Sequence, residues 1–333
     1  MSVLRAIFRI REVLLVLAIA GLLAIVSAAR PAFASPGNLA AIFTDTAILV
    51  MLALGQAAVI MTRSVDLSVA ANLAFTGMAA AMLNAAHPGL PIGVVVGACL
   101  AIGLALGAVN GLLVWLLKLP PIVVTLGTLS IYRGLAFVLS GGAWINTFQM
   151  SERFLAFPRT ELVGLPVLAW LAIATIAGAS ILFGWTAFGR ALYATGGNPT
   201  AATYAGIDTG RTTCLAFCLS GMLAGLCGYL WVSRFAVAYV DVAAGFELDV
   251  IAACVIGGVS IAGGIGSVGG AVLGALFLGI LKNALPVLGV SPFWQMAISG
   301  VIIIAAVILN TRTERSRGRV ILKRIDRLEG VRA

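Results

Sequence analysis

The sequence predicts an all-α, polytopic integral membrane protein, and three observations support this class. Of the 333 residues, 61% are hydrophobic and only 10% are charged, and the mean hydropathy is +1.11. A soluble domain of this length needs a larger polar surface. The apolar residues also form long runs without the alternation typical of membrane β-strands. Because backbone polar groups in lipid must be satisfied within the segment, we expect the spans to be helical.

Ten stretches are long and apolar enough to cross a bilayer, which takes roughly 20 residues per helix. They are residues 13–29, 40–61, 67–86, 92–117, 120–140, 164–184, 211–232, 246–262, 267–285 and 293–310. Proline and glycine interrupt the fifth and eighth stretches. The number of spans would be eight if these two were re-entrant segments.

The distribution of basic residues places both termini in the cytoplasm. The tail after residue 310 has eight basic and three acidic residues, and Arg5, Arg9 and Arg11 lie at the N-terminus. In the ten-span arrangement, the inner side receives 15 of the 21 lysines and arginines. We therefore expect one membrane domain, 1–310, and a basic cytoplasmic tail, 311–333, that suits anionic lipid rather than nucleic acid.

The cytoplasmic loop 185–210 contains a short helix by its local sequence. Asn198 suits the N-cap, Pro199 the first turn and Gly206 the C′ position. Arg190 and Arg211 flank this segment. A short capped helix outside the bilayer favours docking of a soluble motor subunit, although a merely compact loop would have the same pattern.

The residues 257–267 cannot form a stable helix, because five of these eleven are glycine. At membrane depth, irregular backbone is tolerated only against protein or a water-lined cavity. We therefore expect a loop or helix break at the inner end of a translocation path.

Polar residues within or beside the spans are candidates for that path, because polar groups in lipid are costly and face a bundle interior. The candidates are Asp66, Ser68, Asn72, Asn110, Thr125, Thr128, Gly263, Gly264 and Asn283. Neutral amides and hydroxyls suit a sugar better than an ion, but the same groups also join helices. Asp66 or Ser68 would more simply cap the following span. Arg133 either faces the interior or snorkels to an interface.

Several kinds of catalytic site are absent from the sequence. No lysine follows a glycine, so there is no Gly-Lys-Ser/Thr phosphate loop. His87 is the sole histidine, and the five cysteines lie in apolar spans without metal-site spacing. The acidic residues lie at span ends or in loops. We therefore expect no enzyme, no catalytic residues, no cofactor and no metal.

Five motifs in a fixed order carry a resemblance over residues 40–310. They are MTRSVDLS at 61–68, PIVVTLGTL at 121–129, GRALYATGGNP at 189–199, the glycine-rich run 257–270 and GVSPFWQ at 289–295. Together they resemble the membrane permease of bacterial ABC sugar importers, in the branch that handles ribose, xylose, rhamnose and a furanosyl quorum signal. Residues 233–241 and 245–249 are most similar to rhamnose permeases. At 69–72, Val-Ala-Ala-Asn departs from the ribose-type pattern.

The resemblance implies an inner-membrane importer that works by alternating access. Its partners would be an ABC ATP-binding subunit, a periplasmic sugar-binding protein, and a second copy or a similar permease, with membrane lipid around them. The contact with the ATPase would involve Arg190, Asn198, Pro199, Tyr204 and Gly206. The alternative is an autonomous ion-coupled secondary transporter, which usually has a buried acidic residue for the ion.

Overall fold

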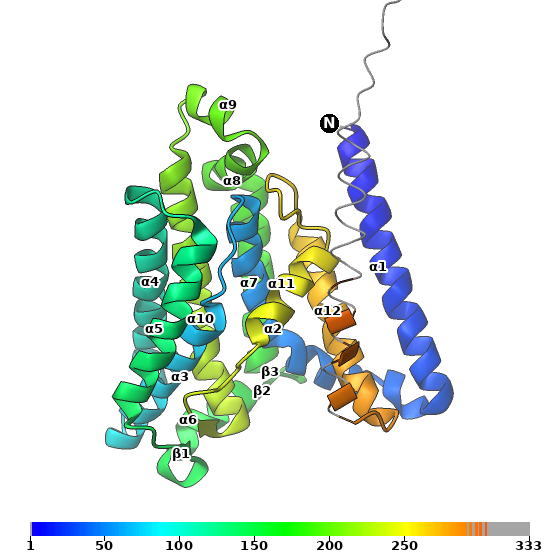
Figure 1. Cartoon of the computed structure of the whole chain (residues 1–333). Coiled ribbons are helices and arrows are strands. Elements are labelled where there is room, and N and C mark those ends of the chain that lie inside the picture. The colour runs from blue at the N-terminus through cyan, green and yellow to red at the C-terminus, as the bar shows by residue number, and fades with distance from the viewer. Residues whose placement is uncertain (1, 292, 295–296, 299, 302–303, 305–333) are drawn as a thin grey trace, which may run out of the picture.

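The computed structural model describes residues 2–291, 293–294, 297–298, 300–301 and 304. In this part of the chain, eight helices are long and apolar enough to cross a membrane, which confirms the all-helical class. They lie side by side (Figure 1). The long helices are α1 (Ser2–Ala29), α2 (Pro36–Met61), α3 (Val69–Ala86), α4 (Ile92–Leu116), α5 (Pro121–Ser140), α7 (Val167–Trp185), α10 (Thr209–Phe235) and α12 (Val268–Val287).

The shorter elements lie mostly at the two ends of these helices. The short helices are α6 (Glu152–Ala156), α8 (Ala187–Gly197), α9 (Pro199–Tyr204), α11 (Phe246–Ile256), η1 (Pro31–Ala34), η2 (Thr147–Gln149) and η3 (Phe157–Arg159). Two antiparallel strand pairs join β1 (Ile145–Asn146) to β4 (Val237–Ala238) and β2 (Glu161–Leu162) to β3 (Leu165–Pro166).

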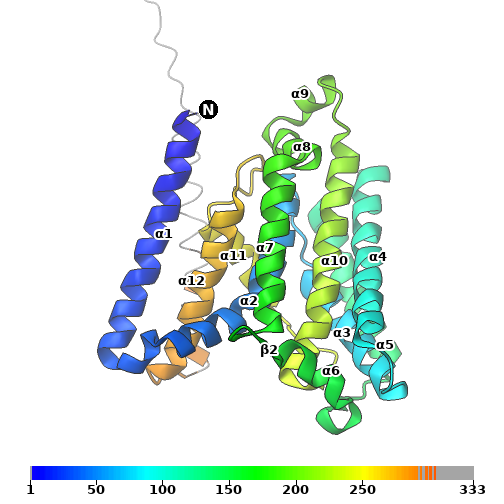
Figure 2. The ribbon, with the colours of Figure 1, turned by 180° about the vertical axis from the view of Figure 1, so that it is seen from behind.

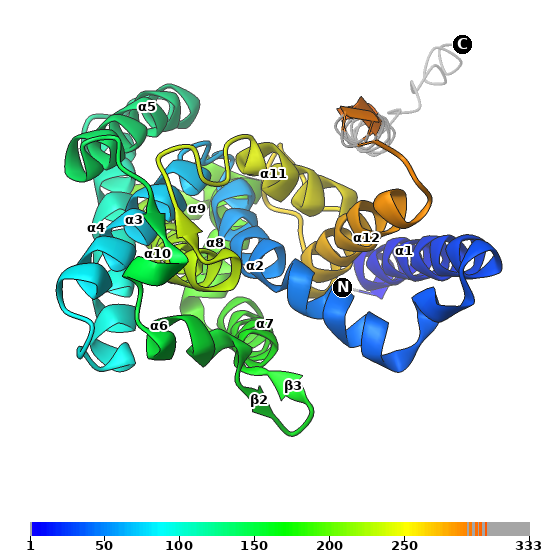
Figure 3. The ribbon, with the colours of Figure 1, turned by 90° about the horizontal axis from the view of Figure 1, so that it is seen from below.

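Helices α8 and α9 lie at one end of the molecule, and α6 and β1 lie at the opposite end (Figures 1 and 2). We name these the inner end and the outer end, because the basic-residue distribution places the first in the cytoplasm. Helix α2 is central and α1 peripheral: 89% of the apolar window of α2 is buried, against 6% for α1. Figure 3 shows α1 at the edge, beside α12.

The regularly spaced glycines of α4 and α10 bring these two helices into backbone contact. A Cβ added at Gly103 would collide with the Gly221 carbonyl, and one added at Gly107 with the Phe217 carbonyl. Helices in lipid associate by such close packing, since the hydrophobic effect does not drive them together. The glycine spacing in the sequence therefore corresponds to a helix–helix seam.

The predicted span 246–262 is wrong as a helix, although the chain does cross between the two ends there. Helix α11 stops at Ile256, and the following glycine-rich loop reaches the inner end, where the Gly264 N–H donates to the Met61 carbonyl (3.0 Å). Gly258, Gly263 and Gly264 have positive φ, which glycine adopts more readily than any other residue. The predicted helix break is thus confirmed.

The other doubtful span, 120–140, and the last predicted span have different outcomes. The predicted span 120–140 is a continuous helix, α5, and no re-entrant segment. Most of the predicted span 293–310, and all of the tail 311–333, lie outside the described residues.

Candidate functional site

The Asp66 carboxylate is the centre of a buried polar cluster between α2, α3 and α10. Asp66 lies in the loop between α2 and α3 and is 2% exposed. Its Oδ1 accepts hydrogen bonds from the Ser68 N–H (2.9 Å) and hydroxyl (2.7 Å), and its Oδ2 accepts one from the Ser220 hydroxyl (3.3 Å). Burial raises the pKa of Asp66, whereas the hydrogen bonds from Ser68 and Ser220 lower it.

The Ser68 side chain does not cap α3. Ser68 occupies the N-cap position, but its side chain makes no capping hydrogen bond. Its hydroxyl instead bonds Asp66 and accepts from the Asn110 amide (2.8 Å). The capping interpretation is therefore wrong for Ser68, whereas Asp66 both accepts from the Ser68 N–H directly before α3 and reaches Ser220 of α10.

The cluster continues into α4 and α5 through further candidate residues. The Asn72 amide donates to the Gly103 and Gly221 carbonyls (3.2 and 3.3 Å), at the seam between α4 and α10. The Thr125 hydroxyl donates to the Val65 carbonyl (3.1 Å), and that of Thr128 to Val124 (3.1 Å). Six of the predicted path residues thus lie in one region. All are buried in the subunit: Asp66, Ser68, Asn72, Asn110, Thr125 and Thr128.

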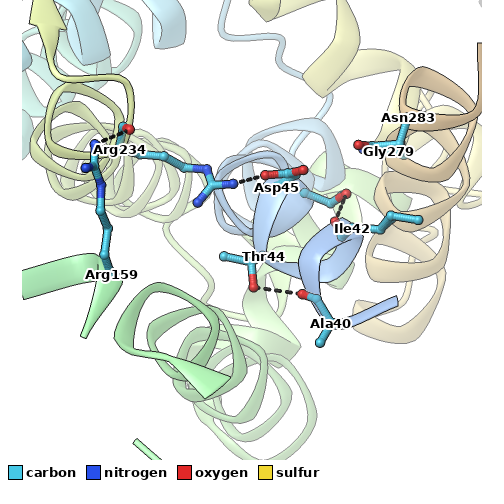
Figure 4. Close-up of polar contacts among 9 residues, drawn as sticks. Ala40, Ile42, Thr44, Asp45, Arg159, Arg234, Gly279 and Asn283 are labelled. Atoms are coloured by element: carbon cyan, nitrogen blue, oxygen red, sulfur yellow. Dashed lines mark hydrogen bonds and ion pairs between the residues drawn. The ribbon is translucent and has the colours of Figure 1, made fainter. Parts of the chain in front are cut away.

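The remaining candidate path residues lie elsewhere. The Asn283 amide, on α12, donates to the Gly279 carbonyl of its own helix (3.0 Å; Figure 4). Gly263 and Gly264 lie in the loop after α11, at the inner end. The structure therefore does not bring all nine predicted residues together.

The predicted helix in the cytoplasmic loop is α9, and its caps are those expected from the sequence. The Asn198 Oδ1 accepts from the Ala201 N–H (3.0 Å), and Gly206 has a φ of +83°. Tyr204 is 89% exposed, and Arg190 is exposed as well. The sequence analysis missed α8, which Thr186 caps by accepting from the Gly189 N–H (3.1 Å). A threonine three residues before a glycine is too common a pattern to predict the start of a helix.

The end of α8 meets the glycine-rich loop and the end of α2 in direct backbone contact. A Cβ added at Gly196 would collide with the Met61 carbonyl and the Gly264 nitrogen. The Arg63 guanidinium donates to the carbonyls of Gly196 (Nε, 2.6 Å) and Gly197 (Nη2, 2.9 Å) at the C-terminus of α8. A cation is favourable there because the helix dipole is negative at this end.

We name this contact the inner joint, and it comprises Met61, Arg63, Gly196, Gly197, Gly263 and Gly264. The Tyr193 hydroxyl adds a hydrogen bond to the Gly266 carbonyl (3.1 Å). A cavity of about 500 Å³ adjoins the joint at the inner end, and Arg63, Trp115, Lys118 and Pro199 are among its lining residues. The sequence analysis gave Arg63 no individual role, because its partners are 133 and 134 residues away.

A second set of contacts, the outer joint, holds the segment that leads into α11. The Arg133 Nη1 donates to the carbonyls of Val240 (2.5 Å) and Val242 (2.7 Å). Arg133 thus reaches from α5 to the loop before α11, where protein carbonyls accept its hydrogen bonds. The Arg159 Nη2 donates to the carbonyls of Ser233 (3.0 Å) and Arg234 (2.7 Å).

Two ion pairs complete the outer joint. Arg234 of α10 pairs with Asp45 of α2 (Figure 4). Lys282 of α12 pairs with Asp249 in the first turn of α11 (2.5 Å), and its Nζ lies 5.7 Å from the centroid of the Phe246 ring. The outer joint therefore comprises Arg133, Arg159, Arg234, Lys282, Asp45 and Asp249. Its contacts from α5 and α12 hold the start of the broken helix, and its other contacts join the end of α10 to α2 and η3.

Comparisons with known proteins give a consistent result. Residues 38–307 match the family described as branched-chain amino acid transport system / permease component. The autoinducer 2 import system permease protein LsrC of Shigella flexneri is 37% identical over 91% of this chain and 87% of its own length. The ribose import permease protein RbsC of Escherichia coli is 36% identical over 88% of this chain and 91% of its own length. No solved structure matches the chain significantly.

Proposed function

The chain belongs to the family of branched-chain amino acid transport system permease components, and we propose that it forms the sugar-conducting subunit of its importer. It is a multi-pass inner-membrane permease component of an ABC importer in the autoinducer 2 and ribose branch. Members of this family do not hydrolyse ATP themselves, in agreement with the missing phosphate loop.

The observation that carries the proposal is the inner joint. Helices α8 and α9 are exposed on one face, where Tyr204 lies, and α8 is in backbone contact with the glycine-rich loop on the other. Backbone contact leaves no side chain to absorb a displacement. A partner that moves α8 and α9 would therefore also move the loop and the half-helix α11.

A separate ATP-binding subunit is the partner that would supply this movement at the inner end. A ligand can shift a conformational equilibrium only by binding the two states differently. The exposed face around Pro199 and Tyr204 is the surface that the ATP-binding subunit would bind differently in the two states. At the outer end, the surface around the outer joint would receive a periplasmic sugar-binding protein. The permease partner would be a second copy or a similar chain.

We infer that the substrate is a small neutral sugar or furanosyl compound. The names of the two relatives above specify autoinducer 2 and ribose, and neither specifies rhamnose. The likeness of residues 233–241 to rhamnose permeases therefore finds no support in these relatives. The buried cluster presents amides and hydroxyls from Ser68, Asn72 and Asn110, which suit hydroxylated ligands if the helices part.

The test is transport by the reconstituted importer in liposomes. Replacing Pro199–Ala205 with a flexible Gly-Ser linker should leave the protein inserted, but ATP hydrolysis by the partner should no longer drive sugar uptake. Ribose, autoinducer 2 and rhamnose would be compared as substrates in the unaltered complex. Normal uptake by the linker variant would contradict the coupling role. Uphill uptake by this chain alone would favour the ion-coupled alternative.

A further inference from the structure

An apolar groove runs along the outside of the helix bundle between α7 and α10. Its cavity volume is about 310 Å³, and α2 forms its floor through Leu54. One wall is a face of α7 and the other comes from α10. The wall residues are Leu171, Ala174, Thr175, Gly178, Ala179, Leu182, Leu219 and Leu223.

The groove has free space at its middle rather than a tightly packed helix contact. A Cβ added at Gly178 would meet no atom within 4 Å. The single lining hydroxyl, that of Thr175, already donates to the Leu171 carbonyl of its own helix (2.8 Å). The groove therefore offers no free polar donor to a ligand, and in a bilayer it faces hydrocarbon.

Basic and aromatic side chains lie at the inner end of both walls. Trp185, 84% exposed, continues the groove face of α7 three residues after Leu182. The Arg190 guanidinium turns back toward the Trp185 carbonyl (3.5 Å). On α10, Arg211 begins a row that continues every four residues through Leu215 and Leu219.

The Asp208 carboxylate caps α10 by accepting from the Arg211 N–H (2.8 Å), but the side chains of these arginines form no ion pair with any described residue. Within the described ranges, the ion pairs of the chain are Arg234–Asp45 and Lys282–Asp249, so neither Arg190 nor Arg211 pairs with a carboxylate. Helix α8, which carries Arg190, packs against both α7 and α10. The arrangement is an apolar slot with two exposed cations at its membrane–water boundary, beside an interfacial tryptophan.

From this arrangement we propose that the α7–α10 groove is a binding site for an anionic phospholipid of the cytoplasmic leaflet. One acyl chain lies in the groove over Leu54 and Gly178. The phosphate group lies at the inner end, between Arg190 and Arg211. Charge complementarity favours this occupant, because its phosphate would bring a negative charge to two exposed arginine side chains that form no ion pair among the residues that the structure describes.

The first test fills the groove. Gly178→Phe places a ring in the free space, and Gly97→Phe is the matched control, because Gly97 is an exposed helical glycine of α4 with equally open surroundings. The purified full-length protein would be titrated with palmitoyl-oleoyl phosphatidylglycerol and examined by native mass spectrometry. We expect Gly178→Phe to lose one bound phosphatidylglycerol and Gly97→Phe to retain it. Retention by both variants would overturn the proposal.

The second test concerns the headgroup. Near an anionic lipid surface each arginine contributes about 1 kcal/mol, or about five-fold in affinity. Arg190→Gln and Arg211→Gln should each weaken phosphatidylglycerol binding by about this factor, with little change for phosphatidylethanolamine of the same chains. Equal affinity of the unaltered protein for the two lipids would overturn the proposal. So would efficient cross-linking of two copies through Ala174→Cys, which would place a second copy in the groove.

Discussion

The inner and outer joints hold the two ends of the same broken crossing, but by different kinds of contact. At the inner joint, Gly196 and Gly264 bring main chain against main chain, and Arg63 binds carbonyl oxygens. At the outer joint, long cationic side chains reach to carboxylates and loop carbonyls. Backbone contact fixes position to a fraction of an ångström, because the space admits no additional atom.

This difference separates two mechanical roles. A joint in which main chain touches main chain transmits displacement directly, which suits the end where the ATPase would push. The two ion pairs of the outer joint are partly exposed and can break and re-form at small cost, since such pairs contribute roughly 0–1 kcal/mol. Such a joint suits the end that must open for sugar. The following predictions test this contrast.

The largest effect should come from adding one methyl group at the inner joint. Gly196→Ala places a Cβ against the Met61 carbonyl and must push α8 away from α2 and the loop. Overpacking typically costs about 1–3 kcal/mol, and rigid backbone offers no easy relief. We expect ATP-driven uptake in proteoliposomes to fall to background while the protein still inserts.

The neighbouring glycine supplies the control for this experiment. A Cβ added at Gly197 meets no atom within 4 Å, so Gly197→Ala should transport normally. If both variants transported alike, the inner joint could not act as a rigid contact.

An intermediate effect should follow from removing the Arg63 guanidinium. Arg63→Gln loses charge-assisted hydrogen bonds to Gly196 and Gly197, which are worth about 1.5–3 kcal/mol each in other proteins. Because the main-chain contact remains, we expect about a ten-fold loss of uptake, or about 1.4 kcal/mol. The number of ATP molecules hydrolysed per sugar imported should rise.

Lys118→Gln is the control for Arg63. It removes a charge from the same inner cavity, where the Lys118 side chain makes no hydrogen bond or ion pair with the described part of the chain. An unchanged ATP-to-sugar ratio in Arg63→Gln would show that Arg63 does not participate in coupling.

The sequence predicted the features of these joints that are set by near neighbours. Asn198 and Gly206 identified α9 because capping acts within one turn, and the glycine run identified the end of α11 because it disfavours any helix. The length of α11 and the existence of α8 depended on packing and were missed.

Contacts between distant segments could not be found in the same way. Ser220 meets Asp66 across 154 residues, and Arg63 meets Gly196 across 133. A single sequence contains no local pattern for such a pair. The sequence therefore indicated that polar residues in the spans are costly to place in lipid. That they are buried together in a hydrogen-bonded cluster is known only from the structure.

The smallest effect should come from the ion pair between Asp45 and Arg234 at the outer joint. Their side chains are 37% and 28% exposed, so solvent screens the pair, and Arg234→Gln should reduce uptake by less than about five-fold. Raising NaCl should narrow the difference in uptake between this variant and the unaltered protein, because salt screens partly exposed charges.

The exchange of the two charges, Asp45→Arg together with Arg234→Asp, should restore uptake. Arg153→Gln, which removes an exposed outer charge, should have no salt-dependent effect. A loss in Arg234→Gln as large as in Gly196→Ala would mean that the two joints are equally rigid, and the contrast between them would have to be abandoned.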